Sequence, residues 1–181
     1  MQRTTLSRNG WIVVVVCAVG TINAFLFSIP IMVGEQPHNH SIGESYLGNS
    51  GVLFQKRPNG CGLTALRMIF QHFGAEISEQ EMERQAEVSG SGYSMLTLKK
   101  VAESKGFRAS GWRLTQYDLK DSPFPLILFV RQNHFVVADS VSSHHVYIRD
   151  PAVGRIRISL KELSRIWSGE ALLIEAQSTK K

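Results

Sequence analysis

A chain of 181 residues is long enough for one domain with a sizeable core and a short additional segment. Hydrophobic residues make up 43% of the chain and charged residues 19%, a globular composition that a membrane segment would make slightly more apolar. The net charge of +5 does not indicate nucleic-acid binding, because the lysines and arginines form no run and are not interleaved with aromatic residues. We therefore expect no nucleic-acid partner.

The N-terminal region begins with a polar flank, residues 1–10, and continues as an uncharged run at residues 11–33. As a helix, this run is long enough to cross a hydrocarbon core of about 30 Å. It is either a single-pass anchor or a cleaved secretory signal, and its length favours the anchor, because a signal core has about 7–15 residues. Arg3 and Arg8 precede the run and no Lys or Arg follows it before Lys56, which predicts that the domain lies on the non-cytoplasmic side. If the segment is cleaved, the protein is instead secreted or periplasmic.

The rest of the chain divides into a linker, one domain and a short tail. Residues 34–51 are rich in Gly, Ser, Asn and His, which is typical of a linker. The domain is expected at residues 52–176 and the tail at residues 177–181.

Three helices are predicted at the start of the domain, at residues 61–73, 78–88 and 94–105. Gly74 and Gly106 end the first and the third. The second begins with a capping-box pattern at Ser78 and is rich in charge, and the third is capped by Ser94. The first helix has a broad apolar stripe formed by Leu63, Leu66, Met68, Ile69 and Phe73.

After Gly106 the pattern changes to strands, expected at residues 107–114, 125–130, 134–140, 146–149, 155–158 and 171–175. A short helical turn at residues 115–119 and a helix that begins at Ser159 and ends at Trp167 interrupt them. Helices followed by strands indicate an α+β fold, in which the helix that begins at Cys61 packs on an antiparallel sheet.

Cys61 stands where a glycine-containing loop becomes that first helix. A helix N-terminus has unpaired N–H groups and a partial positive charge, so it stabilises a thiolate and makes a cysteine nucleophilic near neutral pH. Asn59 is a suitable N-cap, and Gly60 and Gly62 are expected to let another chain approach the sulfur closely.

Three further residues complete a catalytic set with Cys61. His134 opens an apolar strand and can act as the base, and Asp150 ends another strand and can hold the tautomer of the histidine. Gln55 can donate its amide to an oxyanion beside the Cys61 N–H. Asp139 is a rival partner for the histidine, but it lies an odd number of positions along the same strand and should face the other side. His144 and His145 are rival bases that should lie at the far end of the sheet.

Neither a disulfide nor a metal site is expected. Cys17 lies inside the apolar run, away from Cys61. Four histidines outside the catalytic set are candidate metal ligands, but no nearby carboxylate or cysteine completes a site with them. They are His38, His40, His144 and His145. We expect no metal and no cofactor.

In these motifs the chain resembles the bacteriocin-processing cysteine peptidase family over roughly residues 50–176. The shared pattern is a Gln, a short spacer, Cys-Gly and a helix, followed by His-Phe-Val-Val and Asp-Pro-Ala-x-Gly. Family members are papain-like domains that remove double-glycine leaders, often as the N-terminal part of an ABC exporter. Many members have Asp-Cys-Gly where this chain has Asn59-Gly60-Cys61-Gly62, a departure that bears on thiol activation and substrate fit.

The resemblance implies a papain-like cysteine peptidase fold, with Cys61 as the nucleophile, His134 as the base, Asp150 as its orienting group and Gln55 in the oxyanion hole. It also implies cleavage after a small pair, Gly-Gly or Gly-Ala, and makes Tyr93 and Ser94 candidate substrate contacts.

The expected partners are a peptide or protein substrate, the membrane through residues 11–33, and an export machinery. No Gly-x-x-x-x-Gly-Lys-Ser/Thr motif occurs, which indicates a stand-alone form without an ATP-binding cassette. An inactive peptide-binding module of the same fold is the alternative function, although such modules typically lack the cysteine or the histidine. A papain-like transferase or amidase would share the triad and stays open.

Overall fold

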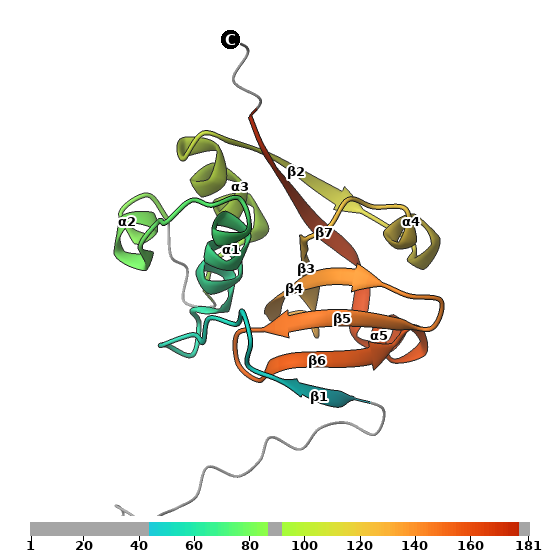
Figure 1. Cartoon of the computed structure of the whole chain (residues 1–181). Helices are drawn as coiled ribbons and strands as arrows, with labels where there is room; N and C mark the ends of the chain where they lie inside the picture. The colour runs from blue at the N-terminus through green and yellow to red at the C-terminus, as the bar shows by residue number, and fades with distance from the viewer. Residues whose placement is uncertain (1–43, 87–91, 178–181) are drawn as a thin grey trace, which may run out of the picture. The chain divides into compact units, whose positions relative to one another are not determined.

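The computed structural model describes residues 44–86 and 92–177, which form a seven-stranded antiparallel sheet with helices against both faces (Figure 1). The strands lie in the order β1-β6-β5-β4-β3-β7-β2. The strands are β1 (Ser45–Gly48), β2 (Phe107–Arg113), β3 (Leu126–Val130), β4 (His134–Val141), β5 (His145–Asp150), β6 (Gly154–Ser159) and β7 (Trp167–Ala176). The helices are α1 (Cys61–His72), α2 (Glu79–Glu83), α3 (Met95–Ser104), α4 (Gln116–Lys120) and α5 (Leu160–Ile166).

One face of the sheet is covered by α1, α2 and α3. Helix α1 is apolar around most of its circumference, and it is buried between β4 and the two other helices, as such a helix must be. Phe70 of α1 stacks on Phe107 of β2 with ring centroids 4.7 Å apart. This packing fixes the N-terminus of α1 over the start of β4.

A second apolar core lies on the opposite face, where α4 and α5 contribute Leu119 and Leu163. Side chains on a strand point alternately to the two faces, so neighbouring residues of β3 and β4 enter different cores. Ile127 and Val137 pack with α1, whereas Leu128 belongs to the core beside α5. Burial on both faces explains why β3 reads as a continuous apolar run.

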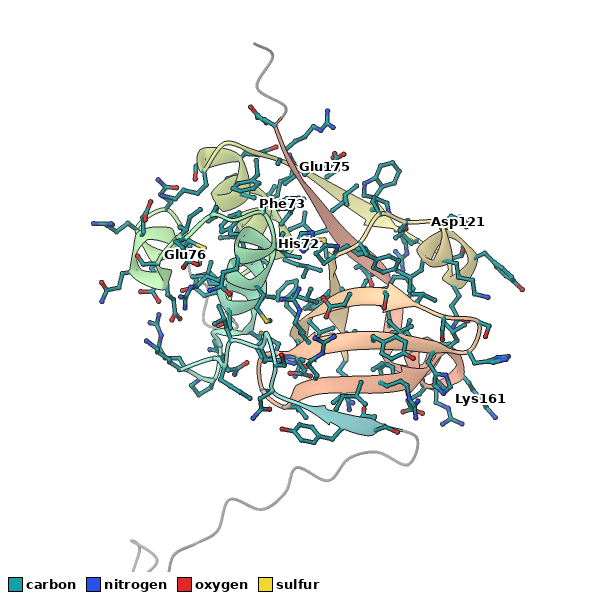
Figure 2. All side chains as sticks on the ribbon, in the orientation of Figure 1. His72, Phe73, Glu76, Asp121, Lys161 and Glu175 are labelled. Carbon is teal, nitrogen blue, oxygen red and sulfur yellow. The ribbon has the colours of Figure 1, made fainter. Side chains whose placement is uncertain are left out.

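The predicted α+β arrangement is confirmed, with differences at element ends. Helix α1 ends at His72, because Gly74 adopts a left-handed φ of 74°, and Phe73 beyond the helix end is 37% exposed (Figure 2). Helix α2 ends at Glu83 rather than near residue 88. Met82 is the only buried residue of this helix, so few buried contacts stabilise a longer one.

The expected linker, residues 34–51, is corrected at its C-terminal end. Residues 45–48 form β1, which pairs with β6 at the edge of the sheet. The short sequence Ser-Tyr-Leu-Gly has no clear alternation, and its strand conformation depends on pairing with a segment more than a hundred residues away.

The predicted transmembrane or signal helix, residues 11–33, lies outside the described residues. Among the helices of residues 44–86 and 92–177, none combines the length and apolar character needed to cross a bilayer.

Candidate active site

Cys61 is the first residue of α1 and is 7% exposed. The residue that precedes the helix is Gly60, which has no side chain to cap it, so the expected N-cap at Asn59 is wrong. Gly62 has a packing role: a Cβ placed there would lie 3.2 Å from both Leu98 and Phe135. The small residue therefore lets α1 approach α3 and β4, and it does not line the open space beside the sulfur as we expected.

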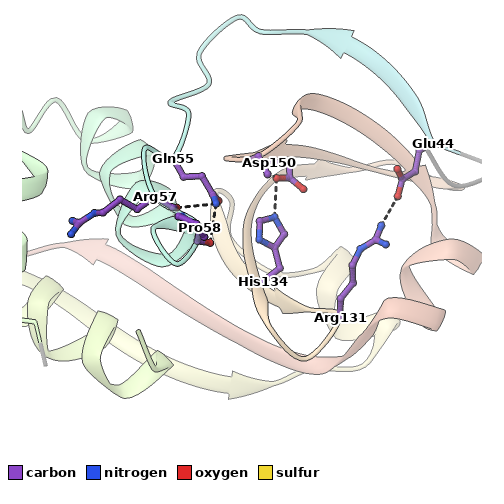
Figure 3. A network of polar contacts seen from close by, with 8 residues as sticks. Glu44, Gln55, Arg57, Pro58, Arg131, His134 and Asp150 are labelled. Carbon is purple, nitrogen blue, oxygen red and sulfur yellow. Dashed lines mark hydrogen bonds and ion pairs between the residues drawn. The ribbon is translucent and has the colours of Figure 1, made fainter. Parts of the chain in front are cut away.

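His134 and Asp150 lie at the same end of two hydrogen-bonded strands, His134 opening β4 and Asp150 closing β5. His134 Nε2 and Asp150 Oδ1 are 2.8 Å apart (Figure 3). The same carboxylate oxygen accepts the backbone N–H of Ala152 at 2.7 Å, and Asp150 is 7% exposed. Because Asp150 engages Nε2, Nδ1 is the ring nitrogen that remains for the thiol.

The surroundings of Cys61 and His134 favour the charged forms of both side chains. Burial of the sulfur opposes its ionisation, but hydrogen bonds from the His134 side chain and the Phe135 backbone outweigh it and lower the pKa of the Cys61 thiol. Burial alone would lower the pKa of His134 as well, but its hydrogen bonds and charge interactions with Asp150 and Cys61 raise that pKa from 6.5 to about 9. A thiolate next to an imidazolium is therefore the form that these surroundings stabilise near neutral pH.

Gln55 holds the loop that leads to Cys61. Its Nε2 donates to the carbonyl oxygens of Arg57 at 3.1 Å and Pro58 at 3.0 Å (Figure 3), and its own backbone N–H donates to Pro151 O at 2.9 Å. These contacts connect the cysteine loop to the turn after Asp150. The Gln55 Oε1 atom is buried without a hydrogen-bond partner. Since both N–H bonds of the amide are used, an oxyanion bound by Gln55 must displace one of the loop carbonyls.

The rival residues have other positions. Asp139 accepts two hydrogen bonds from Arg149 Nε, at 2.8 and 3.0 Å. His144 and His145 lie in and next to the turn that joins β4 to β5, at the opposite end of these strands from His134. The geometry thus brings Cys61, His134 and Asp150 together and leaves the rivals outside the group.

A cleft of about 360 Å³ opens beside Cys61. Tyr93 and Ser94, named above as candidate substrate contacts, line one side of it. Its other lining residues are Pro58, Asn59, Gly92, Met95, Phe129, Gln132, Asn133, Phe135 and Glu170. Gln132 and Glu170 were not predicted from the sequence as site residues. Gln132 lies two residues before His134, and this closeness in sequence could have identified it as a site residue. Glu170 lies at the cleft only because β7 pairs with β3, which no local pattern indicates.

Comparison with known proteins gives a family match over most of the chain. The profile of the Peptidase C39 family matches residues 49–179. An uncharacterized protein of Methanothermobacter marburgensis is 32% identical over 134 residues, which cover 74% of this chain and 94% of that protein. The protein of Pseudomonas aeruginosa named "Probable functional amyloid protease FapD" is 34% identical over 134 residues, covering 68% of this chain and 59% of that protein.

A solved structure with a similar fold is the double glycine motif protease from an AMS/PCAT transporter, determined in complex with the leader peptide. It superposes with a TM-score of 0.67 at 28% sequence identity, and the match covers 75% of this chain and 99% of that one.

Proposed function

The chain belongs to the Peptidase C39 family, and on that premise we propose that it is a cysteine peptidase in which Cys61, His134 and Asp150 act together. The observation that carries the proposal is the continuous hydrogen-bonded series from the thiol to the imidazole to a buried carboxylate. Nucleophilic catalysis by a thiol needs a base within reach and a third group that fixes the tautomer of that base.

The proposed reaction begins with attack of the Cys61 thiolate on the carbonyl carbon of the cleaved bond. The oxygen becomes negatively charged and is stabilised by the Cys61 backbone N–H and the Gln55 amide. The imidazolium of His134 gives its proton to the leaving amine as the carbon–nitrogen bond breaks, which leaves a thioester on Cys61. His134, now neutral, takes a proton from water, and the resulting hydroxide attacks the thioester to release the acid and restore the thiolate. Asp150 keeps Nε2 protonated throughout.

The proposed substrate is a peptide with a small pair, Gly-Gly or Gly-Ala, before the cleaved bond. Its support is the likeness to the double glycine motif protease rather than a glycine-lined cleft, since Gly60 and Gly62 are buried in packing. That relative comes from a transporter, so an export machinery is the proposed partner.

The proposed location is the non-cytoplasmic side of a membrane, with residues 11–33 as an anchor, or a secreted or periplasmic form if that segment is removed. The flanking charges support this orientation. A fusion of alkaline phosphatase after Lys181 tests it, because this reporter is active only outside the cytoplasm. An inactive fusion in cells would mean that the domain is cytoplasmic, and the chemistry at Cys61 would be unaffected by that result.

The test of the chemistry uses an internally quenched peptide with Gly-Gly before the cleaved bond. We expect no turnover by Cys61→Ala and nearly none by His134→Ala, with circular dichroism spectra like that of the unsubstituted protein. His144→Ala is the matched control and should retain full activity, since His144 lies at the other end of the sheet. Turnover by Cys61→Ala would disprove the proposal, and rapid alkylation of Cys61 by iodoacetamide near pH 6 gives a substrate-free check on the thiolate.

A further inference from the structure

The turn between β3 and β4 has an unusual backbone. Arg131 and Gln132 have φ values of 53° and 60°, and the Asn133 N–H donates to Val130 O at 3.3 Å. A positive φ is uncommon for residues other than glycine, asparagine and aspartate, because a longer side chain crowds the backbone there. Two long side chains therefore occupy a turn that neither favours, and His134 follows directly after it. Such backbone strain tends to accumulate where side chains have a function.

The side chain of Arg131 has a structural role. Its Nη2 donates to Glu44 Oε1 at 2.8 Å (Figure 3), and its backbone N–H donates to Ile166 O at 2.6 Å. These contacts hold the turn against α5 and against the residue that precedes β1.

Gln132 has no such role. Its side chain makes no hydrogen bond within residues 44–86 and 92–177, is exposed, and lines the cleft beside Cys61. Tyr93 and Ser94 line the same cleft. Among the residues that the structure describes, this amide thus has no hydrogen-bond partner, and it lines the same cleft as Cys61.

We propose that Gln132 is a substrate-binding residue whose carboxamide pairs with the main chain of the peptide lying in the cleft. This inference rests on the proposed function and specifies how the same site holds its substrate. A carboxamide has one acceptor and two donors, the complement of a peptide unit. If the residues before the cleaved bond are small, they offer little side-chain surface there, and main-chain hydrogen bonds must supply the binding.

The experiment compares Gln132→Ala and Gln132→Gly in the full chain, using the Gly-Gly peptide described above. Both changes remove the amide, and only glycine relieves the positive φ. Loss of one hydrogen bond should raise KM about 2–13-fold in both variants. The midpoint of thermal unfolding should be higher for Gln132→Gly than for Gln132→Ala. Gln71→Ala is the control for loss of an exposed amide outside the cleft, and its KM should not change.

A second arm identifies the main-chain contact. The same peptide is prepared with an ester in place of each amide near the cleaved bond in turn, other than the cleaved bond itself. At one position the ester should raise KM for the unsubstituted protein and leave KM of Gln132→Gly unaltered, because the partner is already gone. The inference would be overturned if, at every position tested, the ester changed KM of the unsubstituted protein and of Gln132→Gly by the same factor.

The remaining outcomes separate this inference from its premise. If the unsubstituted protein cleaves the peptide and both Gln132 variants keep its KM, Gln132 does not bind substrate, and the peptidase assignment stands. If the unsubstituted protein does not cleave the peptide and Cys61→Ala does not bind it, as measured by fluorescence anisotropy, the proposed substrate is wrong and the inference fails with it.

Discussion

Replacing Asp150 by Asn tests the electrostatics of the site most directly. The substitution keeps an oxygen that accepts the His134 Nε2–H and removes the negative charge. The surroundings raise the pKa of His134 from 6.5 to about 9, which corresponds to about 3 kcal/mol in favour of the imidazolium. The side chain of His134 is 18% exposed, so solvent screens this interaction only in part.

The sign of the effect follows from the role of the proton. His134 must be protonated to release the leaving amine, so activity is lost as the pH rises through the pKa of His134, near 9. An opposite charge within hydrogen-bond distance moves a pKa by about 1–3 units, so loss of the Asp150 charge should move this alkaline limit down by about 1–3 pH units. The lower limit of activity is set by ionisation of the Cys61 thiol, whose pKa is lowered by His134 and by the backbone N–H groups of Phe135 and Gly62.

The assay is kcat/KM for the Gly-Gly peptide between pH 5 and pH 10. Asp139→Asn is the matched control, because it removes a nearby carboxylate that pairs with Arg149 instead of with His134. Its alkaline limit should remain near 9. An unchanged limit in Asp150→Asn, or an equal displacement in Asp139→Asn, would refute the assignment of Asp150 as the group that holds the imidazolium.

Three further predictions concern the oxyanion, the substrate and the core. Gln55→Ala should lower kcat about 10²–10³-fold with little change in KM; a change confined to KM would make Gln55 a binding residue. Enlarging either glycine of the peptide to Leu should lower kcat/KM by at least about 10-fold, and equal turnover of the enlarged peptide would contradict a small-pair specificity. Phe70→Ala should lower the free energy of unfolding by about 3–5 kcal/mol in urea titrations, since its ring is fully buried against Phe107; a loss below 1 kcal/mol would mean that this contact contributes little.

Local signals in the sequence predicted most helix starts. Ser78, Ser94 and Ser159 each accept a hydrogen bond from the backbone N–H three residues later, as their patterns indicated. Capping depends on a few neighbouring residues, so the sequence contains the whole signal. Continuous apolar runs likewise predicted the central strands, at residues 125–130 and 134–140.

Features that depend on distant partners were not predictable from local pattern. β1 exists because β6 pairs with it. Helix α1 starts at Cys61 as predicted, but the residue at its N-cap is Gly60 rather than the expected Asn59. The position of Cys61, His134 and Asp150 at one place follows from packing of α1 across the sheet. The order of the motifs along the chain suggested that these three residues form one site, but it did not indicate which packing contacts bring them together.

Strand β1 has a practical consequence for anyone preparing a shortened protein. A version that began at residue 52, the boundary expected from composition, would lack both β1 and Glu44. The backbone groups of β6 would then form an open edge six residues long, available for pairing with another molecule. The same cut would free Arg131 from its carboxylate, one residue before Gln132. A version that begins at or before residue 44 keeps both β1 and Glu44. Self-association or altered peptide binding seen only in the version that begins at residue 52 would therefore be caused by the truncation and would not be a property of the native protein.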